Sequence, residues 1–294
     1  MPFPHEQSLH EIITRVSVQL EAAQLYFGHG TDNAWDEACW LVETLFRRHA
    51  ETSISAESVF PQAALPELEA LLEQRITGRM PLAYLLREAW FAGLPFYVDE
   101  RVLVPRSPLA ELIANQFSPL LKKTPERILD LCCGSGCIGI AAALQYPQAQ
   151  LCLSDLSADA LAVAEININK HALEERVSTV SSDLFDNIQG KFDLILSNPP
   201  YVSEDEYRAL PDEYLREPEL ALLTDAEGLD IPLKILRQAA EFMHEDACLI
   251  LEVGNSWEAL QKALPDMPFM WLDFEHGGHG VCALSKAQLQ AIQA

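Results

Sequence analysis

Positive charge is scarce in this sequence of 294 residues. Its 20 lysines and arginines stand against 44 aspartates and glutamates, which gives a formal charge of −24 at pH 7. Proteins that bind nucleic-acid duplexes hold the phosphates with clustered lysines and arginines. The composition therefore argues against direct nucleic-acid binding. It is compatible with a basic protein partner, although a generally soluble acidic surface explains it more simply.

Long apolar runs and targeting signals are also missing. No run of 18 or more apolar residues occurs, so we expect no membrane span. The first residues lack the basic and apolar parts of a signal peptide. The seven cysteines are odd in number and lie mostly in apolar runs, which predicts reduced thiols in a cytoplasmic protein. Neither they nor the histidines have metal-ligand spacing, so no metal site is expected.

The N-terminal part of the chain has the apolar periodicity of helices. Apolar stripes with helical spacing occupy residues 9–20, 38–45 and 65–76. Asp32 or Asn33 is placed to cap the second of these helices. We therefore predict a small helical domain over residues 1–88.

A different pattern follows over residues 89–108. Two apolar runs, at residues 90–98 and 101–104, flank the polar pair Asp99-Glu100. Runs of this kind on either side of a short polar break are typical of a β-hairpin. This segment is predicted to be a β-hairpin linker.

Strand-like and helix-like segments alternate over residues 109–294. Strands are predicted at residues 128–131, 150–154, 177–180, 192–197 and 248–253, and helices at 139–145, 158–172, 232–243 and 257–263. Such alternation predicts an α/β fold with a parallel, doubly wound sheet. Residues 270–274 and 281–284 have no helix between them, so we expect them to pair as an antiparallel hairpin. The predicted sheet then has seven strands.

The first predicted strand ends in a turn of small residues that suits a cofactor. Residues 128–136 read Ile-Leu-Asp-Leu-Cys-Cys-Gly-Ser-Gly, and the two glycines permit positive φ and close backbone approach to a ligand. Asp155 ends the next strand, where a carboxylate can bind both hydroxyls of a ribose. Asp183 and Leu184 follow the third strand, where a polar side chain and an apolar wall can hold an adenine.

Two cofactors compete for this turn. Residues 134–139 match the dinucleotide fingerprint G-x-G-x-x-G, which by itself leaves NAD open. Asp130 favours S-adenosylmethionine (SAM), because a carboxylate there suits the amino group of a methionine and would repel a pyrophosphate. The run Asn198-Pro199-Pro200-Tyr201 also favours SAM, because hydride transfer has no use for it.

That run follows the apolar strand predicted at residues 192–197. A residue that precedes a proline is held extended, so two prolines fix the chain direction here. The Asn198 side-chain oxygen and the Pro199 carbonyl can accept both N–H groups of a planar amide or aminopurine and aim its nitrogen at a methyl donor. Tyr201 could stack on the flat group. The alternative is a proline-terminated strand that leads into a surface loop.

These motifs resemble the HemK/PrmC family of SAM-dependent N5-glutamine methyltransferases, over nearly the whole chain. The resemblance lies in residues 79–85, 91–93, 102–106, 130–136, 155, 182–183, 198–201, 217–222 and 228–229. Residues 26–38, 106–108 and 252–256 are most similar to the branch of the family that acts on large-subunit ribosomal protein three.

The resemblance implies a Rossmann-like, seven-stranded SAM-dependent methyltransferase domain over residues 109–294, whose methyl acceptor is a glutamine of ribosomal protein three. The helical domain would recognise that protein. A release-factor glutamine methyltransferase, a DNA adenine-N6 methyltransferase and a non-catalytic ribosome-assembly factor remain as alternatives.

The resemblance also implies a set of site residues. Those expected to bind SAM are Asp130, Cys132, Gly134, Ser135, Gly136, Asp155, Asp183, Leu184 and Asn198. Those expected to act on the substrate are Asn198, Pro199, Pro200 and Tyr201. Cys132 and Cys133 depart from the Gly-Thr that is common in the family, and a positive φ at Cys132 would be strained.

Overall fold

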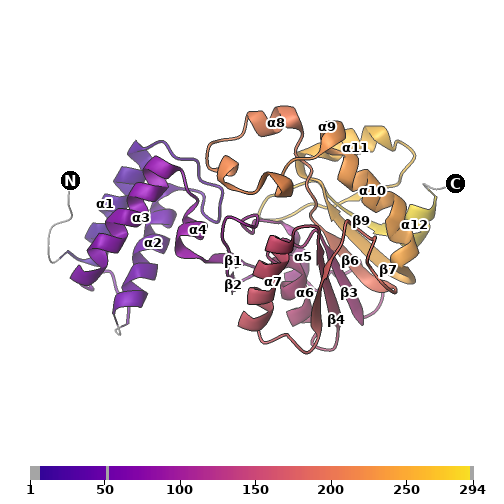
Figure 1. Ribbon diagram of the computed structural model, residues 1–294, viewed down its shortest axis with the longest axis horizontal. Coiled ribbons are helices and arrows are strands. Elements are labelled where there is room, and N and C mark those ends of the chain that lie inside the picture. The colour runs from indigo at the N-terminus through magenta and orange to yellow at the C-terminus, as the bar shows by residue number, and fades with distance from the viewer. Residues whose placement is uncertain (1–6, 51–52, 292–294) are drawn as a thin grey trace. The chain divides into compact units, whose positions relative to one another are not determined.

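The structure, a computed structural model, describes residues 7–50 and 53–291 (Figure 1). The chain forms two compact units. The first extends to Ala89 and also contains Pro211–Arg216, and the second contains Trp90–Leu210 and the chain from Glu217 onward. No local pattern indicates that residues 211–216 join the first unit, because the contacts that hold them there are with residues far away along the chain.

The first unit is helical. Its helices are α1 (Leu9–Ala22), α2 (Ala34–His49), the 3₁₀ turn η1 (Gln62–Ala64), α3 (Leu65–Gly78) and α4 (Leu82–Leu86). Ser8 and Glu11 form a capping box that begins α1. Asn33 caps α2 by accepting a hydrogen bond from the Asp36 N–H at 2.9 Å, so Asn33 and not Asp32 is the cap. The apolar stripes of these helices form one core.

The predicted hairpin is present, but its turn lies earlier than expected. Strands β1 (Ala89–Phe91) and β2 (Leu94–Phe96) pair with each other, and Ala92-Gly93 forms the turn between them. Both turn residues have positive φ, at 49° and 76°. Residues 97–108 form no strand. Asp99, expected in the turn, is instead a buried residue whose carboxylate accepts hydrogen bonds from Arg101.

The second unit contains the predicted seven-stranded sheet. Its strands are β3 (Arg127–Leu131), β4 (Gln150–Asp155), β5 (Val177–Ser181), β6 (Phe192–Ser197), β7 (Met243–Glu252), β8 (Met270–Trp271) and β9 (Val281–Ser285). They lie in the order β5-β4-β3-β6-β7-β9-β8. The five strands from β5 to β7 are parallel. Strand β9 is antiparallel to both β7 and β8, as predicted for the last two strands.

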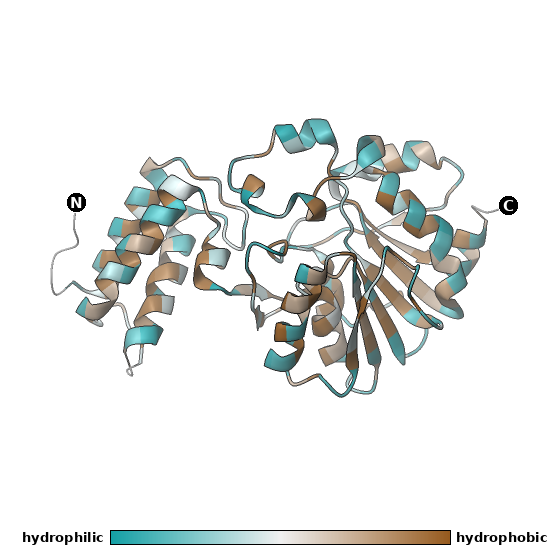
Figure 2. Cartoon of the chain, viewed as in Figure 1, coloured by the Kyte–Doolittle hydropathy of each residue, from teal (hydrophilic) through white to brown (hydrophobic). Residues whose placement is uncertain are grey.

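Helices cover both faces of the sheet, because alternate strand residues point to opposite sides. Ile128, Leu194 and Ile250 belong to one core, and Leu129, Ile195 and Leu249 belong to the other. Helices α5 (Leu109–Ala114), α6 (Cys137–Gln145) and α7 (Ala158–Lys170) contribute to the first core, and α10 (Asp230–Gln238), α11 (Trp257–Ala263) and α12 (Lys286–Gln290) contribute to the second. The strands are mostly hydrophobic in Figure 2, as expected for a sheet that is buried on both faces.

A long excursion leaves the sheet between β6 and α10. It includes α8 (Glu204–Arg208), the 3₁₀ turns η2 (Tyr214–Arg216) and η3 (Glu219–Ala221), and the short helix α9 (Asp225–Gly228). Two further 3₁₀ turns, η4 (Ala239–Phe242) and η5 (Gly254–Ser256), precede β7 and α11. None of the described helices is long and apolar enough to cross a membrane.

Candidate active site

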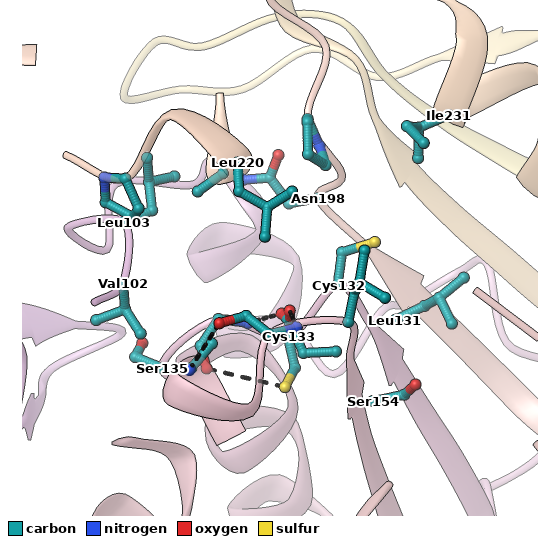
Figure 3. Close-up of a pocket in the computed structure, with 18 of the residues that line it drawn as sticks. Val102, Leu103, Leu131, Cys132, Cys133, Ser135, Ser154, Asn198, Leu220 and Ile231 are labelled. Atoms are coloured by element: carbon teal, nitrogen blue, oxygen red, sulfur yellow. Dashed lines mark hydrogen bonds between the residues drawn. The ribbon is translucent and has the colours of Figure 1, made fainter. Parts of the chain in front are cut away.

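A cavity of about 410 Å³ opens where four parallel strands of the second unit end. Figure 3 shows Val102 and Leu103 on one side of it, Leu220 and Asn198 above, and Cys133 and Ser135 below. The volume falls within the range of small-molecule sites. From β3 the chain runs outward through β4 to β5 and then crosses back to β6 on the other side of β3. Ligands of open α/β sheets bind at such a switch point.

The register of the sheet brings the two predicted motifs together. Leu131, the last residue of β3, pairs with Ser197, the last residue of β6. The Ser197 hydroxyl also donates a hydrogen bond to the Leu131 carbonyl at 2.8 Å. Cys132 of the turn and Asn198 of the Asn-Pro-Pro-Tyr run follow these paired residues directly, and both line the cavity. Two segments more than sixty residues apart in the sequence thus become neighbours.

The turn after β3 has the backbone that its small residues predicted. Gly134 and Gly136 have φ of 54° and 76°. Cys132 has a φ of 61°, so it occupies the strained left-handed region that was anticipated. Asn167 of α7 holds the turn in place, because its buried side-chain amide donates to the Ser135 carbonyl at 2.9 Å. Sequence reasoning missed Asn167, which looked like one polar residue within a helix.

Asp155 lies at the end of β4 and lines the cavity, as predicted. One carboxylate oxygen accepts from the Gly134 N–H and the other from the Ser157 N–H, both at 2.9 Å. Each oxygen has a further lone pair available for a ligand hydroxyl. Burial raises the pKa of Asp155, although these N–H donors oppose the shift.

Asp183 and Leu184 line the same cavity just beyond β5. The Leu184 side chain is buried and has a φ of 48°. Leu156, which follows Asp155, is another apolar residue of the wall and remains exposed. Sequence reasoning did not single out Leu156, because an isolated leucine after a strand has no distinctive signal.

Asp130 was expected among the residues that bind SAM, but it does not lie on the cavity wall. It is only 1% exposed and lies outside the lining of the cavity, in the strand beneath the turn. One carboxylate oxygen accepts from the Gly139 N–H at 2.8 Å, and the other has no partner among the described residues. Burial raises the pKa of Asp130 to about 7, and the nearby Asp155 charge adds to the rise.

The thiols of this turn are inert. All seven cysteines lie in the described part of the chain and are free. Burial raises the pKa of Cys133, and it raises the pKa of Cys137 to about 12. A protonated thiol is neither a good nucleophile nor a metal ligand. Within residues 7–50 and 53–291, no three His, Cys, Asp or Glu side chains are gathered as a metal site.

The Asn-Pro-Pro-Tyr corner presents two of its four residues to the cavity. Asn198 and Pro200 line it, and Pro199 between them is buried. The position of Tyr201 differs from the expected stacking on substrate. Its hydroxyl donates to the Glu252 carboxylate at 3.2 Å, and its carbonyl accepts from the Ser256 hydroxyl at 2.8 Å. Tyr201 is thus bound to the protein on the side of β7.

The opposite wall comes from the segment that precedes α5. Residues 101–103 and 105–107 line the cavity. Arg106 donates two hydrogen bonds to the buried carboxylate of Glu217, at 2.6 and 2.7 Å, and the Val104 N–H donates to the same group at 2.9 Å. Glu217 precedes the cavity residues Pro218 and Leu220, so this bidentate pair joins two parts of the wall.

The residues present fit SAM. The unpartnered Asp130 oxygen beneath the turn lacks the donor that an ammonium group would supply. A Cβ at Gly134 would meet nothing within 4 Å, which leaves open space above the turn for a methionine moiety. Asp155 offers acceptors for ribose hydroxyls, and Asp183 and Leu184 offer the polar and apolar contacts suited to an adenine. A pyrophosphate would meet buried carboxylates instead.

Known proteins agree with this fit. The family model described as the methyltransferase small domain matches residues 110–222. A crystal structure of the hMettl16 catalytic domain in complex with a MAT2A 3′UTR hairpin has the same fold, with a TM-score of 0.55, 13% identity, and coverage of 84% of this chain and 91% of that chain. The fold and the site thus define a SAM-dependent methyltransferase.

Two relatives narrow the class. The ribosomal protein uL3 glutamine methyltransferase of Francisella tularensis is 47% identical over 277 residues, which are 92% of this chain and 88% of the relative. The enzyme of the same name from Neisseria gonorrhoeae is 41% identical over 285 residues, which are 96% of this chain and 95% of the relative. The chain belongs to the family of ribosomal protein uL3 glutamine methyltransferases.

Proposed function

We propose that this protein methylates the side-chain nitrogen of a glutamine in ribosomal protein uL3, the large-subunit protein three, and that it does so in the cytoplasm. The observation that carries the proposal is the placement of Asn198 beside the cofactor turn, through the pairing of Leu131 with Ser197. The two relatives support uL3 as the substrate.

The geometry suits a planar amide. We assign Asn198 Oδ1 and the Pro199 carbonyl as acceptors for the two N–H groups of the substrate glutamine, and Pro200 as an apolar contact to it. Two fixed acceptors in one plane hold the amide nitrogen in a single orientation, which is the main contribution a protein makes to a transfer of this kind. When bound, SAM supplies an electrophilic methyl group on its sulfonium.

The chain needs no strong general base. An amide nitrogen becomes strongly acidic when it is alkylated, so its proton can leave from the hydrogen bond to Asn198 or Pro199. We assign Asp130 and the turn of Cys132, Gly134, Ser135 and Gly136 to the methionine part of SAM, Asp155 to its ribose, and Asp183 and Leu184 to its adenine. Asp130 acts beneath the turn and not from the cavity wall.

The test is a methyl-transfer assay with radiolabelled SAM, in which uL3, a release factor and DNA are offered in parallel. Label on uL3 alone is the expected result. Label on the release factor alone would overturn the substrate, and label on DNA would overturn the chemistry of the acceptor.

Asn198→Ala sharpens this test. We expect its turnover to fall on the order of 100-fold, as for the loss of other oriented polar groups, while SAM affinity measured by calorimetry stays within a few-fold. Asn169→Ala is the matched control, because Asn169 is exposed on α7, outside the cavity lining, and its side-chain amide donates to the Glu165 carbonyl of its own helix. Equal turnover in Asn198→Ala and Asn169→Ala would refute the role of Asn198.

A further inference from the structure

Glu252 is a buried carboxylate that the proposed chemistry does not use. It ends β7 and is 5% exposed. One of its oxygens accepts from the Tyr201 hydroxyl at 3.2 Å and the other from the Ser107 hydroxyl at 2.5 Å. Burying a carboxylate costs free energy unless hydrogen bonds compensate. An apolar residue would fill this position at less cost, so the two hydrogen bonds call for an explanation.

The first bond reaches the corner that carries Asn198. Tyr201 is held at three points, since Glu252 binds its hydroxyl, Ser256 binds its carbonyl, and Gly254 lies against its ring. A Cβ on Gly254 would lie 2.5 Å from Cε2 of the ring, so only glycine leaves room for it there. These contacts fix both the side chain and the backbone of Tyr201.

The second bond reaches the opposite wall of the cavity. Ser107 lines the cavity, and its oxygen also accepts from the Leu109 N–H at 3.1 Å, at the start of α5. Its neighbour Arg106 is bound by Glu217. Glu252 therefore bridges two segments that both line the cavity, the one that contains Ser107 and the one that runs from Asn198 to Tyr201.

We propose that Glu252 is a positioning residue, which acts through Tyr201 and Ser107 to set where the Asn198 amide and the Pro199 carbonyl stand relative to the far wall. The inference rests on the proposed function. Pro199 and Pro200 are the two residues between Asn198 and Tyr201, and their rings stiffen the chain there, so a displacement at Tyr201 is passed to Asn198 instead of being absorbed. A misplacement of about 1 Å can cost about 100-fold in rate.

The test begins with Tyr201→Phe, which removes the hydroxyl and keeps the ring. We expect kcat on uL3 to fall at least 10-fold, with the Kd for SAM within about 3-fold of the wild type and a smaller change in KM. Tyr146→Phe is the matched control, because the Tyr146 hydroxyl also makes a hydrogen bond, to the Gln116 carbonyl at 2.7 Å, outside the cavity lining. It should keep wild-type kcat.

A double-mutant cycle tests whether Glu252 mediates the effect. Glu252→Gln keeps the size of the side chain and alters the hydrogen bonds, so Tyr201→Phe combined with Glu252→Gln should be no slower than the slower single variant. Ser107→Ala probes the other end and should also lower kcat. Wild-type kcat in Tyr201→Phe, or rate losses that multiply independently in the double variant, would overturn the proposal.

A second measurement separates this inference from the proposed function. The Val202 N–H, next to Tyr201, is bonded to the Leu222 carbonyl at 2.9 Å. Its hydrogen exchange should be faster in Tyr201→Phe and Glu252→Gln than in Tyr146→Phe, whatever the substrate proves to be. If the wild type does not label uL3, only the proposed function is refuted. If hydrogen exchange at Val202 is unchanged in Tyr201→Phe and Glu252→Gln, only the positioning role is refuted.

Discussion

At the scale of single residues, the three glycines after β3 have different tasks. A Cβ on Gly139 would lie 2.6 Å from Leu153 Cδ2 and 2.8 Å from Asp130 Cβ, so this glycine allows α6 to pack closely on the sheet. Gly134 has open space around it and needs glycine only for its φ of 54°. Gly136 has both requirements, because its φ is 76° and a Cβ there would lie 2.9 Å from Leu153 Cδ1, so the fingerprint G-x-G-x-x-G combines packing and backbone requirements.

This difference predicts that the substitutions Gly139→Ala and Gly134→Ala lower the free energy of unfolding by different amounts. Gly139→Ala should lower the free energy of unfolding by about 2–3 kcal/mol, because the added methyl overpacks a rigid core. Gly134→Ala should cost about 1 kcal/mol, the strain of a side chain at positive φ. Urea unfolding measures both. Equal losses would contradict the close packing of α6 on the sheet at Gly139.

Asp130 should make stability depend on pH. Burial raises the pKa of Asp130 to about 7, well above the usual range of an aspartate. The neutral form is thus favoured in the folded state, and the folded state loses stability as pH rises from about 4 to about 7. Between pH 5.5 and pH 8, the ionisation of this carboxyl should lower the free energy of unfolding by on the order of 2 kcal/mol.

The comparison with Asp130→Asn isolates that contribution. Asparagine cannot ionise, and its oxygen can still accept from Gly139. Urea unfolding at pH 5.5 and at pH 8 should show that the free energy of unfolding falls less in the variant than in the wild type. An identical fall in the two proteins would show that Asp130 does not titrate in this range, and the pH dependence would then come from the other acidic groups.

At the scale of elements, a buried ion cluster joins three segments of the helical unit. Arg75 of α3 is 2% exposed, and its guanidinium donates to Glu37 of α2 at 2.5 Å and to Glu213 of residues 211–216 at 3.5 Å. Arg79 and the Tyr26 N–H also donate to Glu213. Charge pairing, and not apolar contact alone, thus fixes the segment 211–216 in this unit.

Removal of the central cation should be costly. Arg75→Met takes the buried guanidinium away from Glu37 and leaves Glu213 with that of Arg79 alone, and we expect a loss of about 3–5 kcal/mol in the free energy of unfolding. Arg47→Met is the control, because Arg47 on α2 pairs with Glu43 in an exposed position, where such pairs contribute at most about 1 kcal/mol. Thermal and urea unfolding would show the difference, and similar losses in both variants would contradict it.

At the scale of the whole molecule, the charge of −24 sets which partners can approach. A chain with this charge should bind duplex DNA more weakly than about 10⁻⁴ M at physiological salt, the weak end of non-specific binding. Fluorescence anisotropy with a labelled duplex measures this. Micromolar binding that weakens steeply with salt would reveal a basic groove that the overall charge conceals.

Much of the fold followed from local patterns. Alternating segments indicated the doubly wound sheet, and the missing helix before residues 281–285 indicated the antiparallel end. Local patterns failed where the chain is irregular. The polar pair Asp99-Glu100 predicts the hairpin turn, whereas the structure has the turn at Ala92-Gly93, where both residues have positive φ. Residues 211–216 gave no signal, because distant side chains hold them.

The sequence by itself determined the chemistry of this protein. Asp155, Asp183 and Asn198 could be expected at one edge of the sheet because each follows a predicted strand and parallel strands end at one edge, and all three line the cavity there. Only the tertiary structure decided that Asp130 lies beneath the turn, that Tyr201 binds Glu252, and that Ser107 completes the bridge. The reason is physical: strand periodicity fixes where a residue occurs along an element, whereas hydrogen bonds between distant segments depend on how those elements pack.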